Sequence, residues 1–151
     1  MNSGSGGVFN SPAGLSVSHI VEDTRARVGA GARVHVLAPA TGDGSFRMDA
    51  FNQVVAHDKA KLDAGGAIAV AQSSSLIYVD RADATAEFAS GAQVVSDLGD
   101  ISAGARAEAD LDARAVANAY GLAGAPIGNA YVAYDGSSRA TVAAGTLLQA
   151  D

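Results

Sequence analysis

Apolar and polar residues alternate along much of this chain, and glycines interrupt the alternation at recurring points. The stretch Ala26–Val34 (ARVGAGARV) has Ala first, an apolar residue third, Gly sixth and an apolar residue ninth, and residues 60–68, 86–94 and 140–148 fit the same template. Residues two apart on an extended chain face the same side. Gly adopts positive φ without steric cost. Each copy therefore predicts a strand, a tight corner and another strand, with the corners at Gly31, Gly65, Gly91 and Gly145.

The spacing of the template predicts how the strands are arranged. The last interval between successive corner glycines is about twice as long as the one before it, which suggests a common repeat length. Repeats of roughly 27 residues, each packing only on its neighbours, are typical of a solenoid. We therefore predict an all-β fold, a right-handed parallel β-helix (β-solenoid) with irregular loops at its corners. Its third and ninth template positions should stack in two columns, one of Val28, Leu62, Phe88 and Val142 and the other of Val34, Ile68, Val94 and Leu148.

The composition along the chain predicts one folded domain. Residues 1–14 are rich in Gly and Ser and include Pro12, which favours a flexible linker or a weak cap. Residues 15–151 continue the alternating pattern and are predicted to form a single β-solenoid domain. The sequence ends soon after the last template, so we expect a fragment of a longer repeat array. Its open ends should associate with neighbouring repeats or with another copy, end to end.

The stretch 103–120 (AGARAEADLDARAVANAY) carries two competing signals. Every odd position is Ala or Leu111, and most even positions are polar, which is the period-two pattern of a half-buried strand. Ala, Arg, Glu and Leu are also good helix formers, so a helix is the alternative. A helix would have only Leu111 and Val116 as large apolar anchors, and we therefore expect a strand. A strand over this whole stretch would be unusually long, so we expect it to bend near Leu111–Arg114.

The composition supports a narrow core and limits the classes of function. The 151 residues include 34 Ala but no Trp and only four Phe and four Tyr, and such small side chains require closely spaced backbones. The formal net charge of −6 argues against nucleic-acid binding, which depends on Lys and Arg neutralising phosphates. The absence of Cys excludes disulfides and thiolate metal sites. No apolar run approaches the ~18 residues of a membrane span.

Three stretches resemble repeats in a known class of protein. They are the run DTRARVGAGARV at Asp23–Val34, the A-x-A-x-A ladder within 99–121, and the Gly-containing segment 129–145. Together they resemble the parallel β-helix repeats of very large secreted bacterial surface proteins, the adhesins and haemagglutinin-type exoproteins. The resemblance implies a structural or adhesive rod segment at the cell surface or outside the cell, with host or surface glycans as expected partners. The chain lacks the GGxGxD nonapeptide of calcium-binding relatives.

Few residues are candidates for chemistry. His19, His35 and His57 fit no short zinc motif. His35 alternates outward between Val34 and Val36, so we expect it on an exposed strand face. Glu108, Asp110 and Asp112 share one face of the predicted strand, which in principle could hold a cation or pair carboxylates for catalysis. Arg106 and Arg114 flank them, as Arg81 lies beside Asp80 and Asp83, so we expect solvated, charge-balanced faces. We predict no catalytic, cofactor-binding or metal-binding residues and no enzymatic activity.

Two other classes of function remain as alternatives. Parallel β-helices also host polysaccharide lyases and hydrolases, and a fragment of such a carbohydrate-active protein is the main alternative. That activity requires a groove with several carboxylates and aromatic platforms, and this chain has few aromatic residues. An ice-binding solenoid would need a regular ladder of Thr on one face, and too few Thr residues lie in register.

Overall fold

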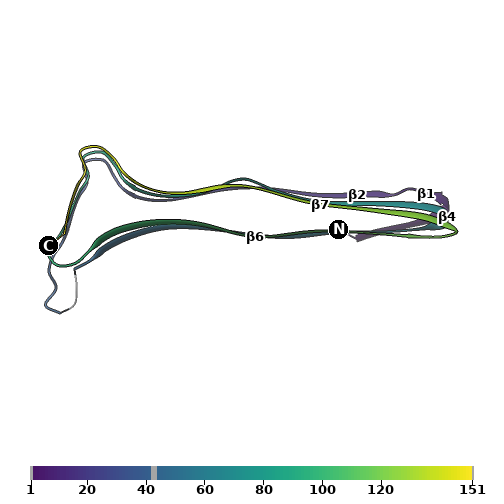
Figure 1. The fold of residues 1–151 in the computed structure, drawn as a ribbon, viewed down its shortest axis with the longest axis horizontal. Coiled ribbons are helices and arrows are strands. Elements are labelled where there is room, and N and C mark those ends of the chain that lie inside the picture. The colour runs from purple at the N-terminus through teal and green to yellow at the C-terminus, as the bar shows by residue number, and fades with distance from the viewer. Residues whose placement is uncertain (1, 42–43, 151) are drawn as a thin grey trace. The chain divides into compact units, whose positions relative to one another are not determined.

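The chain forms strands almost throughout. The computed structural model describes residues 2–41 and 44–150, so the predicted linker's Met1 and the predicted domain's Asp151 lie outside the described residues. The described residues are 81% strand and contain no helix, which confirms the all-β prediction. The strands are β1 (Asn2–Asn10), β2 (Ala13–Val28), β3 (Arg33–Val36), β4 (Phe46–Phe88), β5 (Gln93–Ser96), β6 (Ile101–Tyr120), β7 (Ala123–Val142) and β8 (Leu147–Ala150) (Figure 1).

The strands form two sheets by pairing segments that are far apart in the sequence. In the larger sheet β4 pairs with β1, β2, β6 and β7, and the smaller sheet has the order β3-β5-β8. The ladders whose registers are defined are parallel: β1 lies on β4 from Asn2↔Lys61 to Asn10↔Ala69, and β3, β5 and β8 follow one another in the same direction. Parallel neighbours require a long connection between them, and here the intervening chain supplies other strands.

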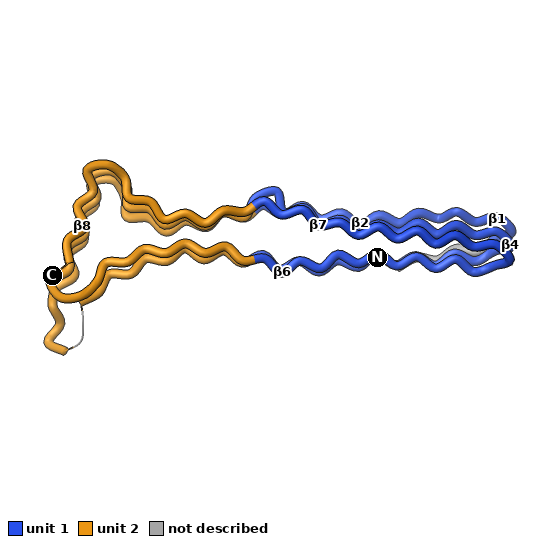
Figure 2. The backbone as a smooth tube through the Cα atoms, viewed as in Figure 1, with its two compact units in different colours: residues 1–21, 54–81, 109–135 blue, residues 22–53, 82–108, 136–151 orange. Residues whose placement is uncertain are grey.

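The chain divides into two compact units, each assembled from three separate segments (Figure 2). Unit 1 comprises Met1–Val21, Val54–Arg81 and Ala109–Asp135, and unit 2 comprises Glu22–Gln53, Ala82–Glu108 and Gly136–Asp151. The sequence predicts one domain over 15–151 because no linker composition separates the units. No linker is needed, since β2, β4, β6 and β7 each contribute residues to both units.

Unit 2 contains three of the four predicted corners. Gly31, Gly91 and Gly145 have φ of 66°, 71° and 75°, and each sits between two strands, as predicted. We call residues 22–36, 82–96 and 136–150 the first, second and third corner segments. Arg33 lies opposite Gln93 and Gln93 lies opposite Leu147, so a corner segment recurs only after about twice the predicted repeat length. The predicted spacing is therefore wrong, since the chain forms long strands on both sides of a corner before it returns.

The corner segments lie in one register. Val34 pairs with Val94 and Val94 with Leu148, which confirms three members of the second predicted column. Backbone hydrogen bonds continue this register: the Ala89 N–H donates to the Val28 carbonyl at 3.0 Å and the Ala143 N–H donates to the Phe88 carbonyl at 2.9 Å.

The core of unit 2 is made of inward-facing residues from both halves of β4. Phe88 is 2% exposed and contacts the ring of Phe46, with centroids 6.2 Å apart. Met48 and Ala50 from the start of β4 join Ala84 and Ala86 from its end, and Val28, Ala92 and Val94 complete the buried cluster. Alternation places these residues on one side of each strand. Their small volume lets the two layers of strands approach closely.

Unit 1 corrects the prediction for the remaining template copy. Residues 60–68 lie within β4, Gly65 pairs with Gly6 in a parallel ladder, and Gly65 is not among the positive-φ glycines. Leu62 belongs to a separate cluster with Ala64, Ala69 and Ala71, and Ile68 pairs with Phe9. Leu62 and Ile68 are therefore not members of the two predicted columns. The local pattern alone does not separate a glycine in a ladder from one in a corner.

Two further segments bear on the sequence analysis. The Gly/Ser-rich start, expected to be irregular, contains β1, because its backbone completes a parallel ladder along residues 61–69. The stretch 103–120 is strand rather than helix, as predicted, and β6 continues without interruption through 111–114, where a bend was expected. A strand of this length is possible because β4 offers it a partner.

One connection makes the first step between corner segments longer than the second. β3 ends at Val36 and β4 begins at Phe46, whereas β5 ends at Ser96 and β6 begins at Ile101. The Phe46 N–H donates to the Asp100 carbonyl at 2.8 Å, so β4 and β6 start side by side. The longer connection after β3 therefore lies outside the paired strands.

Candidate functional site

Each of the three histidines lies beside a carboxylate from a segment far away in the sequence. His19 Nδ1 is 2.8 Å from Asp80 Oδ2, His35 Nε2 is 2.6 Å from Asp97 Oδ1, and His57 Nε2 is 3.4 Å from Asp110 Oδ2. More than half of each imidazole is exposed. The prediction that His35 lies on an exposed strand face is confirmed, and each of the three histidines has a specific acidic neighbour.

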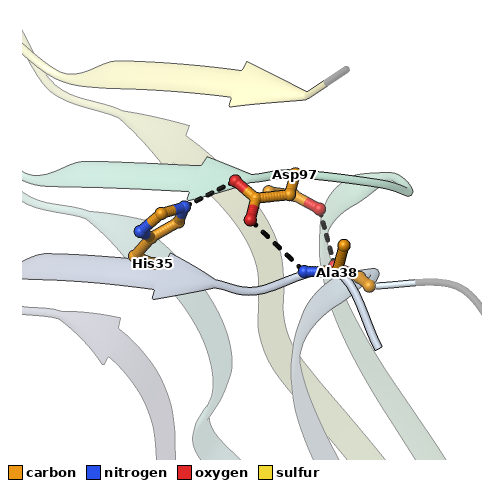
Figure 3. Close-up of polar contacts among 5 residues, drawn as sticks. His35, Ala38 and Asp97 are labelled. Carbon is orange, nitrogen blue, oxygen red and sulfur yellow. Dashed lines mark hydrogen bonds and ion pairs between the residues drawn. The ribbon is translucent and has the colours of Figure 1, made fainter. Parts of the chain in front are cut away.

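The pair between the ends of β3 and β5 is the most closely connected of the three (Figure 3). One carboxylate oxygen of Asp97 contacts His35, and the other accepts a hydrogen bond from the Ala38 N–H at 3.3 Å. These hydrogen bonds, the one with His35 above all, hold the pKa of Asp97 below its ordinary value. The Asp97 N–H in turn donates to the Val36 carbonyl at 3.0 Å. Asp97 therefore ties the end of β5 to the end of β3.

A column of aromatic rings lies on the outer face of unit 1. The rings of His19 and Tyr78 are stacked, with centroids 4.9 Å apart and planes 13° apart, and Tyr131 lies 5.7 Å beyond Tyr78 at 49°. The rings come from β2, β4 and β7 in turn. Each ring packs against a ring on a neighbouring strand, so the column stabilises strand pairing.

The predicted acidic face of β6 is charge-balanced in both units. In unit 2 the Glu108 carboxylate pairs with the Arg106 guanidinium. In unit 1 Asp112 pairs with Arg114 at 2.7 Å, which lowers the pKa of Asp112 and raises the pKa of Arg114. With Asp110 beside His57, each of the three predicted acids faces a basic side chain. This arrangement confirms the expectation of a solvated, balanced face.

The other predicted acidic cluster is divided between the units. Asp80 contacts His19 in unit 1. Asp83 accepts a hydrogen bond from the Ser137 hydroxyl at 2.8 Å in unit 2. These two carboxylates therefore take part in different cross-strand contacts.

Unit 1 has a polar cluster beside the inward-facing serines of β4. Asp58 is half-buried, and its carboxylate accepts hydrogen bonds from the Ser75 hydroxyl at 2.6 Å and the Ser16 hydroxyl at 2.8 Å. The Ser75 bond makes the largest contribution to lowering the pKa of Asp58, and burial opposes it. Ser73 is 1% exposed and its Oγ has no hydrogen-bond partner. The cluster contains one carboxylate among hydroxyls, which suits a structural link between strands.

The residues just described make separate pairwise contacts, between strands or along β6. Across 2–41 and 44–150, no three His, Asp or Glu side chains are grouped so that they could hold a metal ion. Within the same ranges no helix is long and apolar enough to cross a membrane.

Neither Asp97 nor Asp58 stands out in the local sequence pattern. Asp80 and Asp97, the partners of His19 and His35, lie 61 and 62 residues further along the chain. A search for basic and acidic residues at the true spacing of the segments could have found these pairs.

Most of these contacts join polar side chains from segments far apart in the sequence, and the others pair residues two apart on β6. A comparison with protein-family models, curated proteins and solved structures finds no match. The function is therefore inferred from the strand register and the side-chain contacts of the chain itself.

Proposed function

We propose that this chain is a repeat module of a right-handed β-solenoid that forms a rigid rod segment of a secreted or cell-surface bacterial protein. The observation that carries the proposal is the common register of the three corner segments, in which Val34, Val94 and Leu148 pair in sequence. In a solenoid each repeat packs only on its neighbours, so the structure grows along one direction as repeats are added.

The side chains of the module suit a structural role. Ala residues line much of the interior, including Ala82, Ala84, Ala86 and Ala92 at 0–1% exposure. Such residues stabilise by close approach of two layers and leave little room for a ligand between them. The polar chemistry lies in pairs such as His35–Asp97 and Arg27–Glu87, which join neighbouring segments.

An adhesive role belongs to the same proposal. A rod displays its outer faces along its whole length, so weak contacts to a surface polymer are multiplied when repeats are joined. Host or surface glycans are the proposed partners, and the outer faces carry His, Tyr and carboxylate groups able to hydrogen-bond with them.

The rod is tested by length. We would join two copies of the sequence in one chain and compare the single and tandem chains by small-angle X-ray scattering. Three more strand layers at about 4.8 Å each should lengthen one dimension by roughly 14 Å and leave the cross-section unchanged. The circular dichroism spectrum should be β-rich in both chains. A tandem chain that behaves as two independent globules would refute the rod.

The adhesive role needs a separate assay that also addresses the carbohydrate-active alternative. The chain would be applied to a glycan array and incubated with the glycans that it retains, followed by size analysis of those glycans. Retention with unchanged glycan length supports a binding module. Shortened glycans would instead assign a lyase or hydrolase activity, and no retention on any glycan would remove the glycan partner from the proposal.

A further inference from the structure

Among residues 2–41 and 44–150, no strand pairs with the outer side of the third corner segment. β8 is an outer strand of the β3-β5-β8 sheet. Val142 is 59% exposed, whereas Phe88, whose carbonyl accepts from the residue after Val142, is 2% exposed. Leu148 is 38% exposed, whereas its partner Val94 is 0% exposed. The third segment thus exposes apolar side chains at positions that its neighbour buries.

We infer that this edge binds the first corner segment of a second copy of the chain, head to tail, in a parallel register; this inference rests on the proposed solenoid. The first corner segment is the opposite outer strand of the same sheet. The joint repeats an interface that the chain already makes twice, between the first and second segments and between the second and third. Val34 of the incoming copy lies over Leu148, and its Val28 lies over Val142.

The order of the strands favours head-to-tail stacking. Backbone hydrogen bonds run both ways at the first step, from the Gln93 N–H to the Ala32 carbonyl and from the Gly31 N–H to the Ser90 carbonyl. β3 and β8 lie at opposite edges of the β3-β5-β8 sheet, so each offers the side that the other would meet in a continued parallel ladder. Two β8 edges can meet only in antiparallel orientation, which loses the apolar columns. Head-to-tail contacts of this kind build an open filament.

Charges at the joint should weaken the association, and they make its strength adjustable by mutation. Between the second and third segments, Asp83 lies beside Ser137, and the Ala143 N–H donates to the Phe88 carbonyl. Between the first and second segments, Arg27 lies beside Glu87. In these two registers position 25 matches position 85, which matches position 139, so a head-to-tail joint places Arg25 of one copy beside Arg139 of the other. Like charges directly opposite one another on neighbouring strands are destabilising.

The experiment is a charge cycle across the joint, measured by sedimentation equilibrium over a concentration series. Arg139→Glu and Arg25→Glu should each convert the like-charge contact into an ion pair and tighten association about fivefold. The double variant should return to the wild-type dissociation constant or weaker, because two Glu residues then meet. Arg81→Glu is the matched control: it changes the net charge equally, but it lies in β4, which is paired within the chain. Leu148→Lys should weaken association by placing a charge in the apolar column.

The possible outcomes separate this inference from the proposed function. Tightening by both single variants, loss of it in the double variant and no tightening by Arg81→Glu support the head-to-tail joint. Tightening by Arg139→Glu alone would indicate contact between two third segments and overturn the inference. A monomer at every concentration, with a β-rich spectrum, would overturn the association of separate copies and leave the solenoid of each copy intact. A helical spectrum would remove both.

Discussion

Two glycines of one corner allow the backbone contribution to stability to be isolated. A Cβ added at Gly29 or at Gly31 meets no atom within 4 Å, so neither substitution by Ala creates a clash. Gly31 has a φ of 66°, and Gly29 is not among the positive-φ glycines. Replacement by Ala removes similar conformational freedom from the unfolded chain at both sites, which is worth about 0.4–1 kcal/mol in favour of folding. The two variants therefore differ only in the cost of the left-handed conformation.

That cost is about 1–2 kcal/mol for an L-residue. Gly29→Ala should raise the free energy of unfolding by about 0.4–1 kcal/mol, and Gly31→Ala should lie about 1–2 kcal/mol below it. Gly91→Ala should behave like Gly31→Ala, because its φ is 71° and its added Cβ meets only ordinary contacts at 3.8 and 3.9 Å. Urea unfolding followed by circular dichroism, with m-values compared, measures the difference. Equal stability of the Gly29 and Gly31 variants would refute a left-handed corner.

Three further predictions concern the core and the polar contacts. Phe88→Ala should cost about 3–5 kcal/mol in urea unfolding, because it empties the centre of the unit 2 core; a loss below about 1 kcal/mol would contradict that packing. Ser73→Ala should stabilise the protein by about 1 kcal/mol, because it removes an unpaired buried hydroxyl. Ser75→Ala should destabilise it, because it removes the hydrogen bond to Asp58. The melting temperature should rise in the first variant and fall in the second, and a change of the same sign in both would contradict this assignment. Because folding lowers the pKa of Asp97, its ionised carboxylate stabilises the fold above the ordinary pKa of 3.8, and this stabilisation is lost as the pH falls through the lowered pKa. Asp97→Asn should therefore reduce the dependence of the melting temperature on pH below about pH 4. An unchanged dependence in the variant would exclude this contribution.

Local patterns were sufficient to predict the corners of unit 2. The alternation around Gly31, Gly91 and Gly145 identified which residues face inward, and the shared ninth position identified the column through Val34 and Val94. These features depend on side-chain parity and on the freedom of Gly, which are local properties of the chain.

Long-range pairing explains what the sequence analysis missed. Gly65 fits the same template, yet its ladder with Gly6 keeps it in a strand. Nothing within residues 60–68 records that partner. The pair His35–Asp97 likewise depends on which strands are adjacent, and the repeat length assumed from the glycines places neither residue beside the other. Knowledge of which strands pair, and in which register, would have predicted both the strand at Gly65 and the His35–Asp97 pair.

The connections after β3 and after β5 differ in length, yet the strands that follow them, β4 and β6, start side by side. The step from Val36 to Phe46 is longer than the step from Ser96 to Ile101, yet Phe46 still pairs beside Asp100. Ser96 donates a hydrogen bond to the Gly44 carbonyl at 2.6 Å, and Ala38 is held by Asp97, so both ends of the longer step are anchored. Pro39, Ala40 and Thr41, which follow the first anchor, are exposed and belong to no strand. We therefore expect insertions beside these residues to leave the ladders in place, which makes this the point where a reporter or a new binding loop can be inserted into the module.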